Sequence, residues 1–193
     1  MKIVGTGCGP GMLTEEAIRA IKGATKVYGS GRAIAMVQAF LGEGCDVEVL
    51  RDYRNLGDLP PDSVLLSTGD PMLAGLGNLT GEVIPGISSL QVAAARLHVP
   101  LAGIVIVLAH GRDHDEAVIE TMNELSRGKV VFLVADPGFD VPGLAMSLVS
   151  GYKNVRIALC EDLGYPDEQI RTGSCEDPPL PGSALFSLLI GNF

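Results

Sequence analysis

The residues best suited to chemistry lie in the stretch LLSTGDPMLAGLG at residues 65–77, where an apolar run meets a cluster of turn residues. Gly69 permits a positive φ angle, Pro71 fixes φ and lacks an N–H group, and Asp70 presents a carboxylate on a stiff turn. Ligands of open α/β sheets bind outside the carboxyl ends of strands, and these residues fall at such an end. Two further glycines in the stretch indicate close approach to the backbone. The sequence therefore predicts a ligand site here, with an Asx-type turn as the alternative.

A second glycine-rich turn, VGTGCGPGMLT at residues 4–14, joins the opening strand to the first helix. Its backbone N–H groups and the helix N-terminus could receive a ligand, so Gly7, Cys8, Gly9 and Pro10 are candidate contacts. The dinucleotide-binding pattern is not met, because Pro10 stands where its last glycine belongs and no acidic residue closes the second strand–helix unit. The sequence also lacks the G-x-x-x-x-G-K-[ST] phosphate loop. A tight turn without a ligand is the alternative.

Two hydroxyl residues, Ser88 and Ser89, precede a helix of small residues in VIPGISSLQVAAARL at residues 83–97. Hydroxyls at a helix start usually serve as N-caps. The alanine-rich helix behind them would also let a ligand pack closely. Both serines are therefore candidate ligand contacts as well as candidate caps.

A third polar stretch, VLAHGRDHDE at residues 107–116, follows another apolar run. Arg112 can hold a carboxylate through two parallel hydrogen bonds, and His110 lies beside it in the sequence. His110 and His114 have a spacing that brings two histidines together only on a helix, and Gly111 disfavours a helix at that point. Carboxylate binding is therefore favoured over a metal site.

The composition is typical of a folded protein with an apolar core. The chain has 193 residues, 47% of them hydrophobic, a length that fits one large domain or two small ones. The longest apolar run, residues 104–109, is far shorter than the roughly 20 residues that a membrane span requires. The N-terminus leads directly into a strand pattern rather than a secretory signal, so we expect a cytoplasmic protein.

Charge and cysteine content narrow the possible functions. A formal net charge of −9 argues against non-specific nucleic-acid binding, which depends on clustered lysines and arginines. An anionic partner must therefore be bound by local arginines. The four cysteines are dispersed without a C-x-x-C pair, which predicts neither a zinc ribbon nor a disulfide framework.

Apolar runs alternate with helical patterns along the chain, which predicts an α/β fold with mostly parallel sheets. The expected strands are residues 2–6, 46–50, 63–67, 103–109, 129–135, 154–160 and 183–191. Expected helices begin after Thr14, cover residues 32–41, begin at Ser88 and Ser89, and cover residues 115–127. The polar stretch at residues 110–114 suggests a boundary between an N-terminal α/β domain, residues 1–110, and a C-terminal α/β domain, residues 111–193.

Taken together, these motifs resemble the tetrapyrrole (corrin/porphyrin) methyltransferase superfamily, over essentially the whole chain. The shared features are a GxG-type turn leading to Leu13 and Thr14, then Thr68–Gly69–Asp70–Pro71 followed by Gly75, then Pro85–Gly86–Ile87–Ser88–Ser89 before a helix. Within the superfamily, the short length, the His110–Gly111–Arg112 stretch and residues 161–170 look most like the branch that methylates C5 of cobalt-precorrin-7 in cobalamin biosynthesis, in its free-standing form.

The resemblance implies two small α/β domains with S-adenosylmethionine in a cofactor cleft between them, and a homodimer. By similarity, the cofactor, which becomes S-adenosylhomocysteine, would contact Gly7, Cys8, Gly9, Pro10, Gly69, Asp70, Pro71, Ser88 and Ser89. The family implies no metal in the methyl-transfer step. Cys8 occupies the family's proline position when the first glycines are aligned, and the loop is one residue shorter, which leaves open whether Cys8 or Pro10 meets the ligand.

Methyl transfer from a sulfonium is an in-line displacement, and an electron-rich ring carbon already supplies the nucleophile. Alignment and exclusion of water are therefore the expected sources of catalysis, and no catalytic side chain is assigned. A tetrapyrrole substrate carries many carboxylates, for which Arg112, Arg32 and His110 are the predicted contacts. The free-standing form implies a separate precorrin decarboxylase/methyltransferase as partner enzyme, and neither nucleic acid nor membrane is expected as a partner.

Other functions fit the same motifs. Within the superfamily, the substrate could be another precorrin, a modified histidine in a translation factor, or ribosomal RNA. The low positive charge counts against RNA, and the short length counts against the protein-modifying branch. From a different class, a non-catalytic protein that binds S-adenosylmethionine or a tetrapyrrole fits equally, because the reaction requires no side chain whose absence would exclude it.

Overall fold

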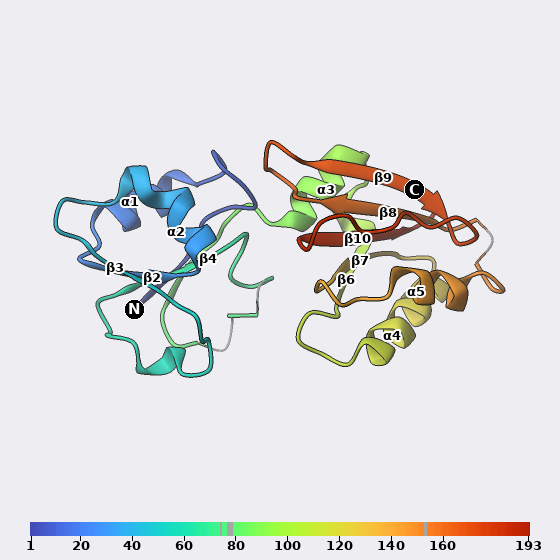
Figure 1. The fold of residues 1–193 in the computed structure, drawn as a ribbon, viewed down its shortest axis with the longest axis horizontal. Coiled ribbons are helices and arrows are strands. Elements are labelled where there is room, and N and C mark those ends of the chain that lie inside the picture. Colours follow the sequence, from blue (N-terminus) through green and yellow to red (C-terminus); the bar gives the residue numbers. More distant parts are fainter. Residues whose placement is uncertain (74, 77–78, 153) are drawn as a thin grey trace. The chain divides into compact units, whose positions relative to one another are not determined.

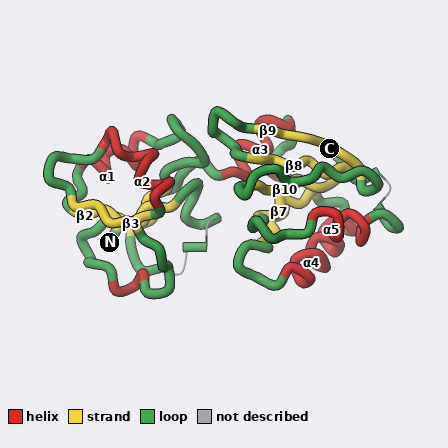
Figure 2. Tube along the Cα trace, viewed as in Figure 1, coloured by secondary structure: helices red, strands yellow, loops and turns green. Residues whose placement is uncertain are grey.

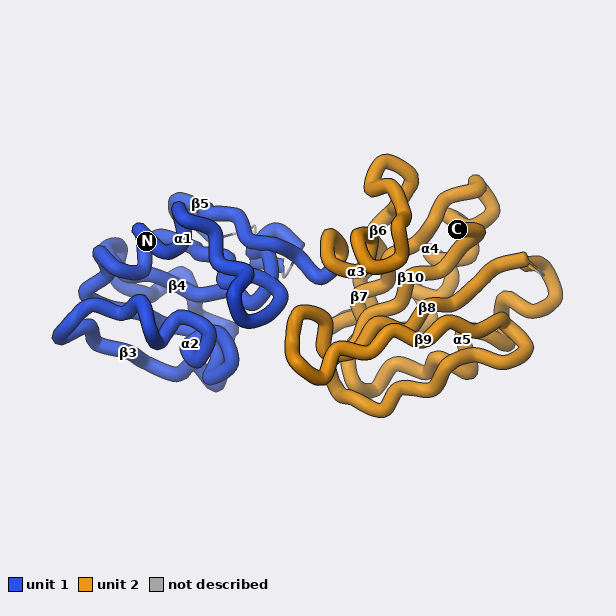
Figure 3. The backbone as a smooth tube through the Cα atoms, turned by 90° about the horizontal axis from the view of Figure 1, so that it is seen from above, with its two compact units in different colours: residues 1–89 blue, residues 90–193 orange. Residues whose placement is uncertain are grey.

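The computed structural model describes residues 1–193 except 74, 77, 78 and 153, so Gly77 of the glycine-rich stretch lies outside the described residues. Two compact units, Met1–Ser89 and Leu90–Phe193, divide the chain (Figure 3). The boundary expected between residues 110 and 111 falls inside the second unit. The reason is strand pairing, because β6 (Ile104–Leu108) lies before that point and pairs with β7 (Val130–Val134) after it.

The first unit is built on a five-stranded sheet in the order β3-β2-β4-β1-β5, in which every pair of neighbours is parallel (Figure 1). Its strands are β1 (Lys2–Gly5), β2 (Lys26–Gly29), β3 (Asp46–Val49), β4 (Val64–Ser67) and β5 (Glu82–Ile84). The central strands β1 and β4 are buried along nearly their whole length, as continuously apolar strands covered on both faces should be.

Helices α1 (Glu15–Lys22) and α2 (Gly31–Val37) pack on one face of this sheet. Thr14 caps α1 by accepting a hydrogen bond of 3.1 Å from the Ala17 amide, which confirms the predicted helix start. Ser30 caps α2 in the same way. The predicted helix 32–41 ends earlier than expected and continues as a 3-10 turn, Gln38–Phe40. A smaller cluster around Tyr28, Leu56 and Leu65 also packs against this sheet. Leu56 begins the 3-10 turn Leu56–Asp58, and Leu65 lies in β4.

The second unit contains a five-stranded sheet in the order β6-β7-β10-β8-β9, with β8 (Arg156–Glu161), β9 (Gln169–Ser174) and β10 (Phe186–Gly191). The pair β6 and β7 is parallel, whereas β10 is antiparallel to β7 and β8, and β9 is antiparallel to β8. The α/β class is thus confirmed, but mostly parallel pairing is wrong for this sheet. Residues 162–168 are too few for the crossover that would make β8 and β9 parallel neighbours.

Three helices belong to the remaining structure: α3 (Ser89–Leu97), α4 (His114–Ser126) and α5 (Val141–Leu148), with a 3-10 turn at Leu101–Gly103. Figure 2 shows α4 and α5 together on one side of the second sheet, where Ala117, Leu125 and Leu144 enter its core. None of the helices in the described part of the chain is long and apolar enough to cross a membrane.

Four elements were not predicted from the sequence: β2, β5, β9 and α5. β5 has only 3 residues, and β9 is an edge strand of mixed polarity with no fully buried position. The start of α5 did carry a recognisable signal. Asp140 accepts a hydrogen bond from the Gly143 amide, and a proline occupies the first turn of the helix.

Candidate functional site

The carboxyl ends of β4 and β1 are joined in the first unit by backbone hydrogen bonds that continue past the strands. The Thr6 amide and hydroxyl both donate to the Ser67 carbonyl, at 2.8 and 3.0 Å. Beyond them, Gly7 and Gly69 exchange two hydrogen bonds, at 3.2 and 2.7 Å. Two of the predicted cofactor-contacting segments are therefore brought side by side at one edge of the sheet.

Asp70 connects this pair of loops to a third loop, the one after β5. One carboxylate oxygen, Oδ1, accepts a hydrogen bond of 2.8 Å from the Met72 amide and closes a local turn. The other, Oδ2, accepts a hydrogen bond of 2.9 Å from the Gly86 amide. The Asx-type turn and the ligand-site interpretation are thus compatible, because Asp70 forms the turn at the place where three loops meet.

Glycine is required in these loops by their contact with one another. A Cβ atom on Gly86 would lie 2.2 Å from the Gly69 carbonyl oxygen, and one on Gly5 would lie 2.5 Å from the Gly86 nitrogen. Real Cβ atoms do not come that close, so a side chain at either position would force the loops apart. Gly7 and Gly69 are held at φ of +81° and +71°, which other residues rarely adopt. At Gly5 and Gly86, the atoms that leave no room for a side chain therefore belong to the backbone of the neighbouring loops.

The remaining predicted cofactor residues surround the same edge. Gly9, Pro71 and Ser88 are buried, Cys8 and Ser89 are half-buried, and Pro10 is exposed. Among the described residues, the atom nearest to a Cβ atom on Gly69 would be the Ser88 Cα, at an ordinary contact distance of 3.9 Å. These residues therefore leave more space at Gly69 than at Gly5 or Gly86.

The three predicted substrate-binding side chains lie in different units. Arg32 is exposed in the first turn of α2, and its Nη2 donates a hydrogen bond of 3.5 Å to the Thr68 hydroxyl, next to the joined loops. His110 and Arg112 belong to the second unit, where both are exposed in the loop between β6 and α4. Gly111 between them has a φ of +69°, so the helix that would bring His110 and His114 together does not form.

A histidine–carboxylate pair that the sequence did not reveal lies near this loop. His114, the first residue of α4, places Nε2 at 3.0 Å from Oδ2 of Asp136, and its ring meets Phe139 edge-on at 5.2 Å. The hydrogen bond from His114 lowers the pKa of the Asp136 carboxyl, and the Gly138 amide adds to this effect against the influence of burial. In the part of the chain that the structure describes, no group of three or more potential ligands could hold a metal.

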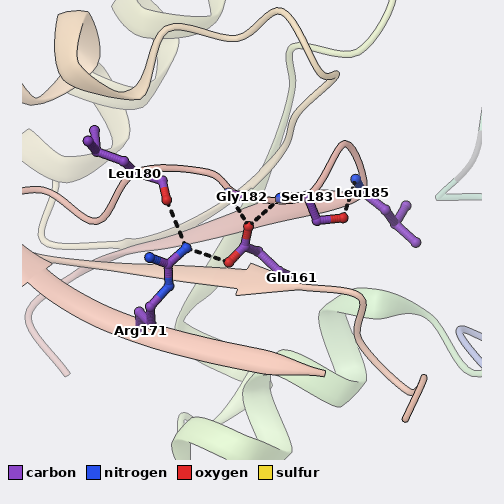
Figure 4. A network of polar contacts seen from close by, with 6 residues as sticks. All are labelled: Glu161, Arg171, Leu180, Gly182, Ser183 and Leu185. Atoms are coloured by element: carbon purple, nitrogen blue, oxygen red, sulfur yellow. Dashed lines mark hydrogen bonds and ion pairs between the residues drawn. The ribbon is translucent and has the colours of Figure 1, made fainter. Parts of the chain in front are cut away.

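The stretch at residues 161–168, which the family resemblance singled out, contains two carboxylates that hold loops in place. Figure 4 shows Glu161, which is 3% exposed, accepting hydrogen bonds from the Gly182 and Ser183 amides at 2.6 and 2.8 Å and from Arg171 at 2.6 Å. Burial alone would raise the pKa of Glu161, but Arg171 and the two amides outweigh it and lower the pKa. Glu161 thereby fixes the connection between β9 and β10.

Glu168 likewise holds the connection between β8 and β9 in place. Its two oxygens accept hydrogen bonds from Arg96 of α3, at 2.6 Å, and from the Gly164 amide, at 2.7 Å. Burial would raise the pKa of Glu168, and the charge and hydrogen bonds of Arg96 and Gly164 lower it instead. Glu161 and Glu168 therefore both have hydrogen-bond partners within the second unit that account for their position.

The two cysteines of the second unit are buried, Cys160 on β8 at 1% exposed and Cys175 at 8%. Neither forms a disulfide. Burial raises the pKa of Cys160 to about 12, so its reactive thiolate form is scarce at neutral pH.

Fold and loop geometry define an α/β protein in which glycine-rich loops meet at the carboxyl edge of a parallel sheet, the edge where open α/β sheets bind their ligands. Residues 2–179 match the tetrapyrrole (corrin/porphyrin) methylases, and the chain belongs to this family. It is a methyltransferase, as the motifs predicted.

Among proteins of known sequence, the chain is 27% identical to the probable cobalt-precorrin-7 C(5)-methyltransferase of Methanocaldococcus jannaschii, over 89% of this chain and 88% of the relative. It is likewise 27% identical to the cobalt-precorrin-7 C(5)-methyltransferase of Salmonella typhimurium, over 88% of each chain. Among solved structures, the precorrin-6Y methylase of Archaeoglobus fulgidus is 28% identical with a TM-score of 0.76, covering 100% of this chain and 98% of that one. The methyltransferase CobJ shares the fold at a TM-score of 0.78 and 16% identity, over 99% and 93% of the two chains.

Proposed function

We propose that this methyltransferase transfers the methyl group of S-adenosylmethionine to C5 of cobalt-precorrin-7, a step of cobalamin biosynthesis. The supporting observation is that two relatives bearing the name of this activity are each 27% identical to the chain across nearly its whole length. The structure of a precorrin-6Y methylase follows the same fold over all of this chain.

The joined loops of the first unit fit such a cofactor. Among the described residues, Gly69 is less crowded than Gly5 and Gly86, since the atom nearest to a Cβ atom there would be the Ser88 Cα at 3.9 Å, and this leaves its backbone open to a cofactor. The residues proposed to hold it are Gly7, Cys8, Gly9, Pro10, Gly69, Asp70, Pro71, Ser88 and Ser89. When bound, S-adenosylmethionine supplies an activated methyl group on a sulfonium, so the chain need not provide a nucleophile.

The contribution of the chain is then positioning. Holding two reactants in a reactive geometry can supply roughly 7–11 kcal/mol of the barrier in favourable cases. Joined loops suit this task, because a preorganised site has less conformational freedom to lose when a ligand binds. Arg32, Arg112 and His110 are the proposed contacts for the carboxylates of the tetrapyrrole, which a chain of net charge −9 must bind through local cations.

Three further features belong to the proposal. The protein acts in the cytoplasm, as a homodimer, and a separate precorrin decarboxylase/methyltransferase acts on the same intermediate. Sedimentation at micromolar concentration tests the dimer directly, since a monomer would contradict it.

The decisive experiment is anaerobic incubation of purified protein with methyl-labelled S-adenosylmethionine and enzymatically prepared cobalt-precorrin-7, followed by mass and NMR analysis of the macrocycle. One added methyl group at C5 is the expected result. Tight binding of S-adenosylhomocysteine without transfer would reject the substrate and direct the search to other precorrins. Binding of the tetrapyrrole with no turnover on any precorrin would instead indicate a non-catalytic binding protein.

A further inference from the structure

Gly69 and Asp70 lie between two loops and are bonded to both. The backbone of Gly69 exchanges two hydrogen bonds with Gly7 in the loop after β1. The side chain of Asp70 reaches in the other direction and accepts the Gly86 amide of the loop after β5. One dipeptide therefore sets the spacing of all three loops at this edge of the sheet.

The Asp70 carboxylate is turned toward the protein. Each of its oxygens accepts one backbone N–H, from Met72 at 2.8 Å and from Gly86 at 2.9 Å. Hydrogen bonds from amides to a charged carboxylate are stronger than those between neutral groups. A carboxylate engaged in this way is better suited to holding loops together than to reaching outward for the cofactor.

The packing of the three loops explains why a hydrogen bond between them is needed, and the bond from the Gly86 amide to the Asp70 carboxylate is called the tie below. Gly5, Gly69 and Gly86 touch through backbone atoms alone, because any Cβ at Gly5 or Gly86 would collide. Glycine loses more conformational freedom on ordering than any other residue, so a contact of glycines alone is costly to keep in place. The Gly86 amide also needs an acceptor at this half-buried position, and Asp70 supplies it.

We propose that Asp70 is a positioning residue, which fixes the loops after β1, β4 and β5 in the arrangement that receives the cofactor, and does not itself form an ion pair with the sulfonium of the cofactor. This inference rests on the proposed function. It predicts that loss of the tie weakens S-adenosylmethionine and the uncharged thioether S-adenosylhomocysteine by the same factor. A carboxylate paired directly with the sulfonium would instead favour the charged cofactor alone.

The test compares Asp70→Asn with a matched control, Asp52→Asn. Asparagine at position 70 has one acceptor oxygen in place of two, so it cannot accept the Met72 and Gly86 amides together. With the local turn to Met72 kept, the hydrogen bond between the loops is lost. Asp52 accepts the Arg54 amide at 3.0 Å in a similar turn, but its other hydrogen bonds go to the side chain of Arg54 itself. The control therefore alters a turn without separating two loops.

Calorimetry should show Asp70→Asn binding both ligands about tenfold more weakly, a change of about 1.4 kcal/mol, at unchanged stoichiometry, with the Asp52→Asn protein unaffected. An effect on folding alone would lower the stoichiometry and leave the affinity of the folded molecules as it was. Hydrogen exchange of the Gly86 amide, measured without ligand, should become faster in the Asp70 variant only.

Each other outcome has a defined meaning. Unchanged affinity for both ligands, with wild-type protein binding normally, overturns the inference, and so does a loss confined to S-adenosylmethionine. If the wild-type protein binds neither ligand, the proposed function is contradicted. Hydrogen exchange of the Gly86 amide then tests only whether Asp70 bonds to the loop after β5. If Asp70→Asn does not fold, Asp70→Ser replaces it, because a serine hydroxyl can serve the local turn but is too short to reach Gly86.

Discussion

The two units of this methyltransferase fix their loops by different physical means. In the first unit, loops at the ends of parallel strands touch through glycine backbone, with a Cβ-free contact between Gly86 and the Gly69 carbonyl oxygen. In the second unit, buried carboxylates hold the connections of a mostly antiparallel sheet, as Glu161 does for Gly182 and Ser183. The contact in the first unit depends on glycines without side chains, with the Asp70 carboxylate bonded to the Gly86 amide beside it, whereas the second unit relies on a carboxylate inside the connection.

This difference in how the loops are held indicates which unit is better suited to bind a ligand. Backbone contacts bring three loops together without side chains between them, and among the described residues Gly69 is less crowded than Gly5 or Gly86. A buried carboxylate instead occupies the interior of the turn that it organises, since Glu161 is 3% exposed. The first arrangement suits a binding site, whereas the second suits stability. Variants that exchange or remove these features should separate the two roles.

Gly86→Ala should have the largest effect. The added Cβ would lie 2.2 Å from the Gly69 carbonyl oxygen and 2.9 Å from the Gly5 Cα, and both are backbone atoms that cannot turn aside. We expect a loss of about 3 kcal/mol in the free energy of unfolding, with cofactor binding abolished in the protein that remains folded. Urea unfolding and calorimetry measure the two effects.

The matched control for Gly86→Ala is Gly31→Ala in α2, where a Cβ would meet nothing within 4 Å. This control should change stability by less than about 1 kcal/mol, because alanine is the better helix former. Equal stability of the two variants would contradict the close backbone contact of Gly86 with Gly69 and Gly5.

Glu161→Ala should come second, with a loss of about 2 kcal/mol in the free energy of unfolding. The reason is that the Gly182 and Ser183 amides lose their acceptor and Arg171 loses its partner. Thermal unfolding monitored by circular dichroism gives the change. Replacement of the exposed Glu120 on α4 by alanine removes the same charge and should cost far less; a comparable loss in both proteins would argue against a structural role for Glu161.

Arg32→Ala should change substrate binding and leave stability alone. Arg32 is exposed, and its hydrogen bond to Thr68 is long at 3.5 Å, so little folding energy depends on it. We expect the KM for the tetrapyrrole to rise about fivefold at an unchanged thermal midpoint. Arg19→Ala is the control, since Arg19 is an exposed arginine on α1 whose pair with Glu15 is 3.9 Å long. A similar rise in KM for both variants would indicate a general effect of charge.

Glu168→Gln should have the smallest effect, below about 1 kcal/mol, and one that depends on pH. Arg96 and the Gly164 amide lower the pKa of folded Glu168 below its ordinary value of 4.5. A carboxyl group with a lowered folded-state pKa stabilises the protein above its unfolded pKa, and this contribution is lost as the pH falls through the folded value. Wild type should therefore exceed the variant in stability at neutral pH, and the two should converge toward about pH 3.

Urea unfolding across that pH range measures the difference for Glu168→Gln. In an Arg96→Ala background, the substitution should matter less, because the charged partner at 2.6 Å is gone. A difference between wild type and variant that grew in acid would contradict the lowered pKa.

Sequence patterns were reliable where local chemistry decides the structure. Continuous apolar runs predicted β1, β4 and β7, and Thr14 predicted the start of α1, because burial on both faces and N-capping depend on residues close together in the chain. The family motifs were equally local, and their order and spacing predicted the methylase family that the match over residues 2–179 confirms. The residue roles assigned by that resemblance stay predictions.

Only the tertiary structure decided which segments meet. The sequence showed a glycine at position 86 and an aspartate at position 70, but their hydrogen bond joins residues 16 apart and depends on β1 lying between β4 and β5. The pairing of His114 with Asp136 and the antiparallel order of the second sheet were hidden for the same reason. Composition and turn chemistry are written along the chain, so the sequence by itself determined the class of fold and the positions of the glycine-rich loops. Strand order is set by contacts between distant segments, so only the folded chain reveals that Asp70 ties those loops together.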